Sequence, residues 1–522
     1  MRKAIGLPLL ILILGLCGCA SLPSSVQRQA SSHADRDQEP SRIASGVAPY
    51  LREHPGQSGF WLLGDGLDAF AARVLLAEAA DRTIDVQYYL YHDDVTGRIL
   101  TNRLLRAADR GVRVRLLLDD MATKGLDTVL ATLDTHPNIQ VRIVNPYASR
   151  GFRGLETLAR FDTVTRRMHN KSFSVDKVTT IVGGRTVGNE YFDAHETVNF
   201  GDLDVLAIGP AAAEVGEQFD LYWNSELAYP IRFLTGNPGS LEALRRDLAE
   251  FDEAQHDSPY AQRVRSSGLV RDFVAGTLQL QWGHALVFYD LPEKLVTDPE
   301  DRASHMAPRL LPKTLGALER DLLLLSPYFV PGEHGVVILT DLEKRGVQVR
   351  VLTNSLASTD VGIVHAGYAK YREPLLRGGV EIYELKPDAD SAAKGTLAKL
   401  SGSTGASLHA KTSVFDRSSL FVGSANLDPR SGKLNTELGI LFESAPLAET
   451  LEDWFEANNA RIAYRVSLDK SHCEDPRQCE GRLRWTEQDG EREVTYLSDP
   501  RTGLLSRFVI SLVALLPVEG QL

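Results

Sequence analysis

One short motif occurs twice in this chain, at positions 240 residues apart. Each copy has a lysine two residues after a histidine and an aspartate five residues after that lysine: His169, Lys171 and Asp176, then His409, Lys411 and Asp416. Alternate side chains of an extended strand share one face, so each histidine would stand beside a fixed positive charge. An imidazole can act as nucleophile or proton carrier, and an ammonium group can neutralise an anionic substrate. A single histidine is more often structural, but two copies in register favour a catalytic pair.

A glycine-containing segment follows each copy at the same offset. The first copy is followed by Gly183 and Gly184, and the second by Gly423 and Ser424, with Asn426 two residues further on. Because glycine has no side chain, its backbone can approach a phosphate oxygen closely. We therefore expect these segments to bind or orient a phosphate through Gly183, Gly184, Ser424 and Asn426.

The segments around the two motifs predict the same order of elements. In the first half, strands at 83–89 and 111–118 flank a helix around Leu100, and in the second half strands at 322–328 and 346–352 flank a helix around Leu339. Nearly continuous apolar strands alternating with amphipathic helices indicate sheets covered on both faces. The sequence therefore predicts the α/β class, with two α/β/α lobes that arose by duplication of one domain.

The length of 522 residues exceeds what one hydrophobic core usually supports. We expect a first lobe over 59–230, a charged connector over 231–267, a second lobe over 268–465 and a C-terminal extension over 466–522. The formal net charge of −12 disfavours a polyanionic partner, so no nucleic acid is expected. The sequence shows no convincing cluster of metal ligands, and we expect neither a metal nor a cofactor.

Residues 1–19 have the pattern of a lipoprotein signal peptide. A short basic start precedes an apolar run at 5–16, which is too short to cross a membrane because a spanning helix needs about 20 residues. A small residue precedes Cys19, the expected lipid anchor; ordinary secretion and an uncleaved anchor are the alternatives. Residues 20–58, which are largely polar at their start, are expected to form a tether. The chain would then be anchored to a bacterial membrane and face the periplasm, with inner and outer membrane both open.

Two segments near the C-terminus add to this picture. Cys473 and Cys479 lie six positions apart, and in an exported chain they would form a disulfide, unless they stay free surface thiols. Residues 504–516 are apolar but too short to span a bilayer. This segment would either lie in a membrane interface or pack on a lobe, and the sequence favours neither.

The paired motifs resemble those of the phospholipase D superfamily over roughly residues 60 to 465. The resemblance implies two lobes related by a pseudo-two-fold axis that share one active site. It also implies that one histidine attacks phosphorus to form a phosphohistidine while the other protonates the leaving alcohol. By analogy we assign His169 as nucleophile and His409 as general acid, and the reverse assignment stays open. In this family a downstream carboxylate orients each imidazole: Glu437 is the candidate for His409, and Asp202 for His169.

The first motif departs from the commonest family pattern. Gly184 stands in place of a serine, and Thr186 in place of the asparagine that corresponds to Asn426. Similar Gly-Gly-Arg variants occur in the cardiolipin synthase branch, so activity is still expected. Arg185 would either supply positive charge at the site or be solvated.

Several stretches resemble the bacterial cardiolipin synthase C type, above all residues 355–360 and 364–372. The resemblance implies a membrane-bound enzyme that transfers a phosphatidyl group from one phospholipid to the glycerol of phosphatidylglycerol, with phosphatidylethanolamine as a further candidate substrate. Hydrolysis by water and lipid binding without turnover are the alternatives. His365, Tyr368 and Tyr371 would either line the site or pack on a helix face.

Overall fold

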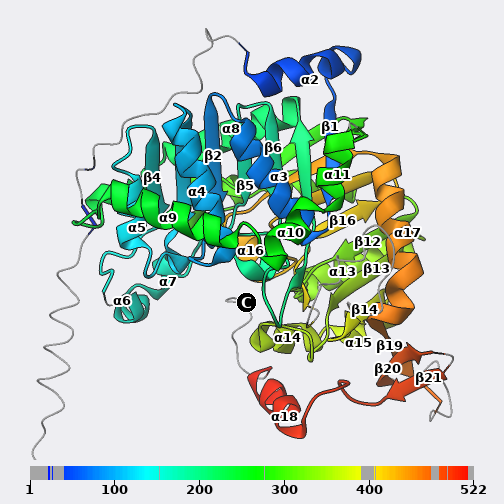
Figure 1. The fold of residues 1–522 in the computed structure, drawn as a ribbon. Helices are drawn as coiled ribbons and strands as arrows, with labels where there is room; N and C mark the ends of the chain where they lie inside the picture. Colours follow the sequence, from blue (N-terminus) through cyan, green and yellow to red (C-terminus); the bar gives the residue numbers. More distant parts are fainter. Residues whose placement is uncertain are drawn as a thin grey trace, which may run out of the picture.

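The computed structural model shows two α/β lobes, each built on one large sheet with helices packed against it (Figure 1). The predicted architecture of two similar lobes is confirmed. The described residues are 22, 23, 26, 40–151, 153–275, 277–389, 405, 407–471, 481–490 and 492–514.

The sheet of the first lobe has nine strands among the described residues, in the order β10-β1-β8-β6-β5-β2-β3-β4-β9. Its strands are β1 (Ser58–Leu63), β2 (Thr83–Tyr88), β3 (Arg113–Asp119), β4 (Ile139–Val144), β5 (Ser172–Val175), β6 (Thr179–Gly183), β8 (Asp204–Ile208), β9 (Ala228–Pro230) and β10 (Gln281–Gly283). Its helices are α3 (Gly66–Ala79), α4 (Val95–Asp109), α5 (Asp127–Leu133), α6 (Arg153–Ala159), α7 (Phe161–Val164) and α8 (Pro210–Trp223). Strand β2 is buried along its whole length, as a central strand covered on both faces must be.

The sheet of the second lobe has ten strands among the described residues, in the order β11-β18-β17-β16-β12-β13-β14-β19-β20-β21. Its strands are β11 (Ala285–Tyr289), β12 (Asp321–Leu325), β13 (Gln348–Asn354), β14 (Glu381–Leu385), β16 (Thr412–Phe415), β17 (Ser419–Gly423), β18 (Leu438–Glu443), β19 (Ala463–Asp469), β20 (Arg482–Asp489) and β21 (Arg492–Tyr496). Its helices are α12 (Ala307–Thr314), α13 (Gly332–Lys344), α14 (Gly362–Ala369), α15 (Arg372–Arg377), α16 (Pro429–Lys433), α17 (Ala445–Ile462) and, near the end of the chain, α18 (Leu504–Val513).

The two sheets repeat one topology. The order β1-β8-β6-β5-β2-β3-β4-β9 corresponds strand by strand to β11-β18-β17-β16-β12-β13-β14-β19. The turns repeat as well: Gly111 before β3 and Gly346 before β13 have φ of 97° and 91°, a conformation that glycine adopts without steric cost. The four strands predicted around the two halves are thus present as β2, β3, β12 and β13.

The lobes meet through a shared apolar layer. Residues of β6, β8 and α8 from the first lobe join residues of β17, β18 and α17 from the second in one buried cluster. Within this cluster Phe60 stacks on Phe442 with ring centroids 4.3 Å apart. Burying apolar side chains of both lobes in one cluster stabilises the contact between the lobes.

The boundary between the lobes lies later than predicted. Helices α9 (Leu241–Gln255), α10 (Pro259–Arg265) and α11 (Gly268–Ala275) pack on α3 and α4 of the first lobe, so 231–267 is not a free connector. Strand β10 pairs with β1, and the second sheet begins only with β11. A second lobe starting at residue 268 is therefore wrong. The high charge of this segment belongs to the exposed side of α9, which buries only Leu248 fully.

Both ends of the predicted domain plan also change. Within the expected tether, helix α2 (Arg42–Glu53) is capped by Ser41 and fastened to the first lobe by an ion pair between Arg42 and Asp81. At the other end, β19 pairs with β14, so the sheet continues into the expected C-terminal extension. The proposed lipid anchor Cys19 and the proposed disulfide of Cys473 and Cys479 lie outside the described residues. Among the described residues, no helix combines the length and apolar character needed to cross a bilayer.

Candidate active site

Each motif lies on the segment that leads into a central strand. Lys171 immediately precedes β5 and Lys411 immediately precedes β16, so each strand begins three residues after the histidine of its motif and does not include the histidine or the lysine. Each lysine is buried, and its Nζ donates to the backbone oxygen of its own histidine, at 2.9 Å for Lys171 and 2.6 Å for Lys411. These bonds hold the two ammonium groups beside the two imidazoles, His169 and His409.

The opposite lobe holds each motif in place. The backbone N–H of His169 donates to the oxygen of Thr436 at 2.9 Å, and that of His409 donates to the oxygen of Gly201 at 2.7 Å. The second contact continues a short parallel pairing of β15 (Ser407–Leu408) with β7 (Phe200–Gly201). The interface between the lobes therefore passes through both histidines.

The carboxylates that orient the histidines come from the opposite lobe. His169 Nδ1 lies 2.9 Å from Glu437 Oε2, and His409 Nδ1 lies 2.6 Å from Asp202 Oδ2. The expected pairing of each histidine with a downstream carboxylate of its own lobe is wrong. Thr436 and Gly201 each accept a backbone hydrogen bond from the histidine of the opposite lobe. The residue that follows each of them, Glu437 or Asp202, therefore reaches the imidazole of that opposite lobe.

The two carboxylates are supported in different ways. Glu437 accepts hydrogen bonds from Ser424 Oγ at 2.5 Å and from Ser431 Oγ at 2.7 Å. Gly184, at the position equivalent to Ser424, instead makes room: a Cβ there would lie 2.3 Å from Asp202 Oδ1. Gly183 is similarly packed against Asp204. Ser424 and the two glycines thus serve the carboxylates or the packing around them, and binding of phosphate by these segments stays a prediction.

Burial shifts the pKa values of the two histidines and the two lysines. It lowers the pKa of His169 to about 4, with Lys171 adding to the shift and Glu437 opposing it. Burial and the neighbouring lysines also lower the pKa of His409 well below its ordinary value. Burial lowers the pKa of Lys171 to about 7 and that of Lys411 to about 8. Cations are disfavoured in this dry site, so a bound anion would restore charge to these groups.

Aromatic rings contact both imidazoles. Tyr89 meets His169 edge-on at 5.1 Å, Tyr191 meets His409 edge-on at 5.2 Å, and Phe200 stacks on His409 at 5.4 Å. Sequence reasoning did not assign these roles. A tyrosine directly after the buried strand β2 was the available signal for Tyr89.

A further pair of residues that the sequence did not reveal holds the backbone ahead of each histidine. Asp119, at the end of β3, accepts from the N–H of Met168 at 2.9 Å. Asn354, at the end of β13, accepts from the N–H of Leu408 at 2.8 Å. Both lie at the carboxyl ends of equivalent strands, where α/β folds commonly place functional groups.

The motif aspartates lie away from the imidazoles and have a structural role. Asp176 accepts from the backbone N–H groups of Asp81, Arg82 and Thr83, at 2.8 to 3.1 Å. Asp416 does the same for Glu319, Arg320 and Asp321, at 2.7 to 3.1 Å. Each aspartate stands at the far end of its strand and caps the start of the neighbouring strand. Their expected place among the catalytic residues is therefore wrong.

Other residues singled out by sequence take up structural positions. Arg185 is buried and donates to backbone oxygens, including that of Asp202, so it is not solvated. Thr186 bonds to the backbone of Leu90. Asn426 Oδ1 is buried and receives no hydrogen bond from any described residue, which leaves it available for a ligand. The helix-face alternative holds for three others, which are buried on α14 or just after it: His365, Tyr368 and Tyr371.

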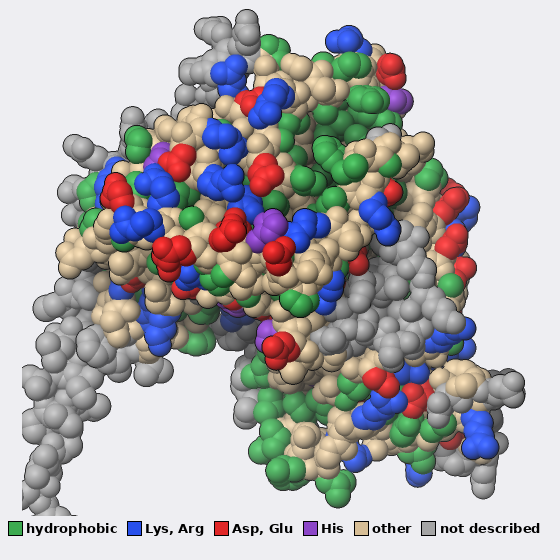
Figure 2. All heavy atoms as spheres, in the orientation of Figure 1, with side chains coloured by type: hydrophobic (Ala, Val, Ile, Leu, Met, Phe, Trp, Pro, Cys, Tyr) green, Lys and Arg blue, Asp and Glu red, His purple; other side chains and the backbone are tan. Residues whose placement is uncertain are grey.

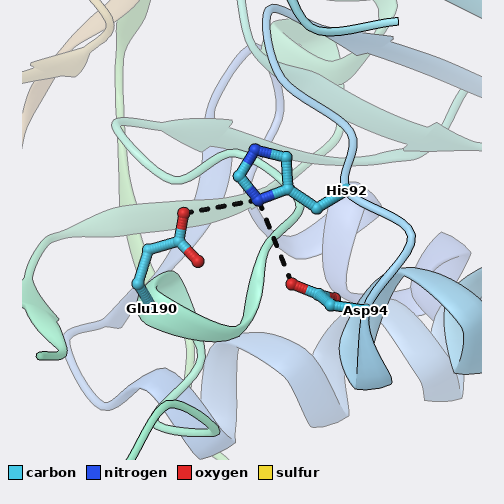
Figure 3. Close-up of side chains that lie close together, drawn as sticks. All are labelled: His92, Asp94 and Glu190. Atoms are coloured by element: carbon cyan, nitrogen blue, oxygen red, sulfur yellow. Dashed lines mark ion pairs between the residues drawn. The ribbon is translucent and has the colours of Figure 1, made fainter. Parts of the chain in front are cut away.

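One cluster has side chains that could bind a metal ion. His92 Nδ1 lies 3.5 Å from Glu190 Oε1 and 4.0 Å from Asp94 Oδ2 (Figure 3). Asp94, however, already caps α4, accepting from Gly97 N–H, and its other oxygen accepts from Asn189 N–H. The cluster therefore ties the start of α4 to the turn that carries Tyr191, which contacts His409.

Comparisons with known proteins match both lobes. A family model described as cardiolipin synthase, PLD-like domain, fits residues 74–223 and again 313–458. The chain is 42% identical to cardiolipin synthase C of Escherichia coli (strain K12) over 92% of this chain and all of that protein. It is 27% identical to cardiolipin synthase A of Pseudomonas syringae pv. syringae (strain B728a) over 79% of this chain and 70% of that protein. The crystal structure of phosphatidylserine synthase from Haemophilus influenzae Rd KW20 has the same fold, with a TM-score of 0.54 and 12% identity over 80% of this chain and 92% of that one.

Proposed function

The chain belongs to the cardiolipin synthase family of the phospholipase D superfamily, and from this we propose that it makes cardiolipin from phosphatidylglycerol and a second phospholipid. It is a phospholipase D-type phosphatidyltransferase. The observation that carries the proposal is the crossed pair of buried histidine–carboxylate contacts, His169 with Glu437 and His409 with Asp202, beside two buried lysines. A protein that only binds lipid has no use for two nucleophilic groups held in this way.

The carboxylates decide which ring nitrogen reacts. Each imidazole directs Nδ1 to a carboxylate, so that nitrogen carries the proton and Nε2 keeps the lone pair. Glu437 has a lowered pKa despite its burial, because His169, the hydrogen bond between them and Lys171 favour its ionised form. An ionised Glu437 stabilises the positive charge that His169 gains as it attacks. We therefore assign His169 as the nucleophile.

The first half of the reaction forms a phosphohistidine. His169 Nε2 attacks phosphorus, the bond from phosphorus to the leaving alcohol breaks, and protonated His409 gives its proton to that alcohol. Lys171 and Lys411 neutralise the non-bridging oxygens in a site from which water is largely excluded. The negative charge of the bound phosphodiester opposes the effect of burial on His409 and favours the protonated form that this step needs.

The second half transfers the phosphatidyl group. His409, now neutral, takes the proton from a hydroxyl of phosphatidylglycerol, whose oxygen attacks phosphorus while the bond to His169 breaks. Cardiolipin leaves and both imidazoles return to their starting state. Water as the acceptor would instead give phosphatidic acid, which is the hydrolase alternative.

We include phosphatidylethanolamine among the donors. Asp360 is exposed and accepts from Tyr328 Oη at 2.8 Å, and the ring of Tyr328 lies 5.9 Å from Lys411 Nζ. The charge of Asp360 also acts on His409 and Lys411. An ammonium headgroup reaching this carboxylate would place its phosphate among the two lysines. We further propose that Cys19 anchors the enzyme to the membrane that holds these lipids.

Mass spectrometry of lipids tests the function directly. Incubation with phosphatidylglycerol, with or without isotope-labelled phosphatidylethanolamine, should yield cardiolipin, and label in its phosphatidyl groups would identify the second lipid as donor. His169→Ala and His409→Ala should each reduce turnover by several orders of magnitude. Phosphatidic acid as the main product would favour hydrolysis, and unchanged lipids would refute the proposed function.

A further inference from the structure

Helix α18 turns its apolar side away from the protein. Five of its ten residues are large, apolar and between 46% and 81% exposed: Leu504, Leu505, Phe508, Val509 and Leu512. At 100° per residue these five side chains fall within an arc of about 140°. A terminal helix that only packs on a lobe would bury such an arc. Figure 2 shows the corresponding hydrophobic patch at the lower edge of the molecule, where Figure 1 places α18.

The opposite side of α18 contacts the protein next to the active site. Ile510 lies against Gly362, the first residue of α14, where an added Cβ would be 3.4 Å from its Cδ1. Two residues earlier in the chain, Asp360 bonds to Tyr328, whose ring faces Lys411. A short series of contacts therefore links Ile510 of α18 to the catalytic Lys411. Ile363, also exposed, extends the apolar surface from α18 onto α14.

From these contacts we propose that α18 and Ile363 form a membrane-docking surface that lies in the interface of a lipid bilayer. The choice of lipid as the partner rests on the proposed function, because substrates with two acyl chains must reach Lys411 from a bilayer. The charge of the helix fits as well: Arg507 is its one charged residue and lies off the apolar arc. Apolar residues on one side and a cation on the other are typical of interfacial helices on anionic lipid. At ten residues, α18 is far too short to span the bilayer.

The test places a reporter on the helix. The full-length protein with Phe508→Trp is reconstituted into vesicles of phosphatidylcholine and phosphatidylglycerol, and its fluorescence is compared with wild type in ordinary and brominated phosphatidylcholine. We expect the added tryptophan to be quenched at least twofold by the brominated lipid. Val337→Trp, on the exposed side of α13, is the matched control and should not be quenched. Lack of quenching at position 508, or shielding of that tryptophan that depends on protein concentration alone, would overturn the proposal in favour of a second copy of the chain.

Activity supplies an independent readout. The double variant Leu505→Ser with Phe508→Ser should reduce turnover of long-chain phosphatidylglycerol in vesicles by roughly tenfold or more, because two large apolar side chains no longer enter the interface. The same variant should keep its turnover of dihexanoyl phosphatidylglycerol, dissolved as monomers, within about twofold. Equal loss with both substrates would contradict docking. Because the fluorescence measurement needs no turnover, failure of docking and failure of the proposed function remain distinguishable.

Discussion

Replacing Asp202 with asparagine removes one charge from the crossed arrangement and keeps its shape. Asp202 Oδ2 lies 2.6 Å from His409 Nδ1, where a carboxylate stabilises the imidazolium that acts as general acid. A hydrogen bond to a charged group contributes about 1.5–3 kcal/mol. At about 1.4 kcal/mol for each factor of ten, the first half of the reaction should slow by roughly ten- to a hundredfold. This loss should depend on how much the leaving group needs a proton.

Pre-steady-state release of the leaving group from two donors measures that dependence. Phosphatidylglycerol releases glycerol, which must be protonated, whereas phosphatidyl-p-nitrophenol releases a stable phenolate. Asp202→Asn should therefore show the full loss with the first donor and a nearly wild-type burst with the second. Glu437→Gln is the matched control: it should slow both bursts, because Glu437 serves the attacking His169. Equal losses of Asp202→Asn with both donors would refute the role of His409, and the opposite pattern would exchange the two histidines.

Three further predictions follow from the same contacts. Because burial lowers the pKa of His169 to about 4, its neutral form stabilises the fold above pH 6.5, and this stability is lost as the pH falls from 6.5 towards 4. Between pH 6.5 and pH 4 the free energy of unfolding of wild type should fall by about 3 kcal/mol relative to that of His169→Gln, as measured by thermal denaturation at each pH. Asp176→Asn should lower the free energy of unfolding by about 2–3 kcal/mol in denaturant titration, since three backbone N–H groups lose their carboxylate, while kcat stays within a few-fold. A loss of kcat well beyond a few-fold in a variant that is still folded would instead show that Asp176 is a catalytic residue. Gly184→Ser should displace Asp202 and lower phosphatidyl transfer at least tenfold, whereas Gly216→Ser, with open space around its Cβ position, should not; equal activity of the two variants would contradict this.

The repeated topology and the four central groups could be predicted from sequence because duplication leaves a constant offset. Positions 169 and 171 reappear at 409 and 411, and the strands around them reappear in the same order. Nearly continuous apolar strands that alternate with amphipathic helices then indicate a sheet covered on both faces. The motifs and the apolar strands can each be read from a short stretch of sequence, and the duplication shows the same short stretch a second time.

The crossed pairing could not be predicted, because a pattern that is symmetric along the chain does not say which copy faces which. Asp202 follows His169 and Glu437 follows His409 in sequence, yet the contacts at Gly201 and Thr436 exchange them. The motif aspartates misled for a related reason. Asp176 is part of the repeat because it caps β2, and a repeated structural residue looks the same in sequence as a repeated catalytic one.

The domain boundaries failed where composition alone was the guide. A charged stretch predicted a connector, but α9 is charged on its exposed side while its other side packs on α4. Strand β10 has only three residues and carries no strong strand signal, although it closes the first sheet. Helix α2 follows the polar start of the expected tether, and its capping Ser41 was the signal that could have revealed it.

The exchange of carboxylates has a consequence for a chain that is still being synthesised. A nascent polypeptide ending before residue 437 already contains His169 and Lys171, but lacks the acidic partner on which that imidazole depends. His409 likewise has its partner, Asp202, only when the amino-terminal half has folded against it. A half-finished chain therefore has no complete active site, and cleavage of phosphodiester bonds begins only once both halves have been synthesised and have folded against each other.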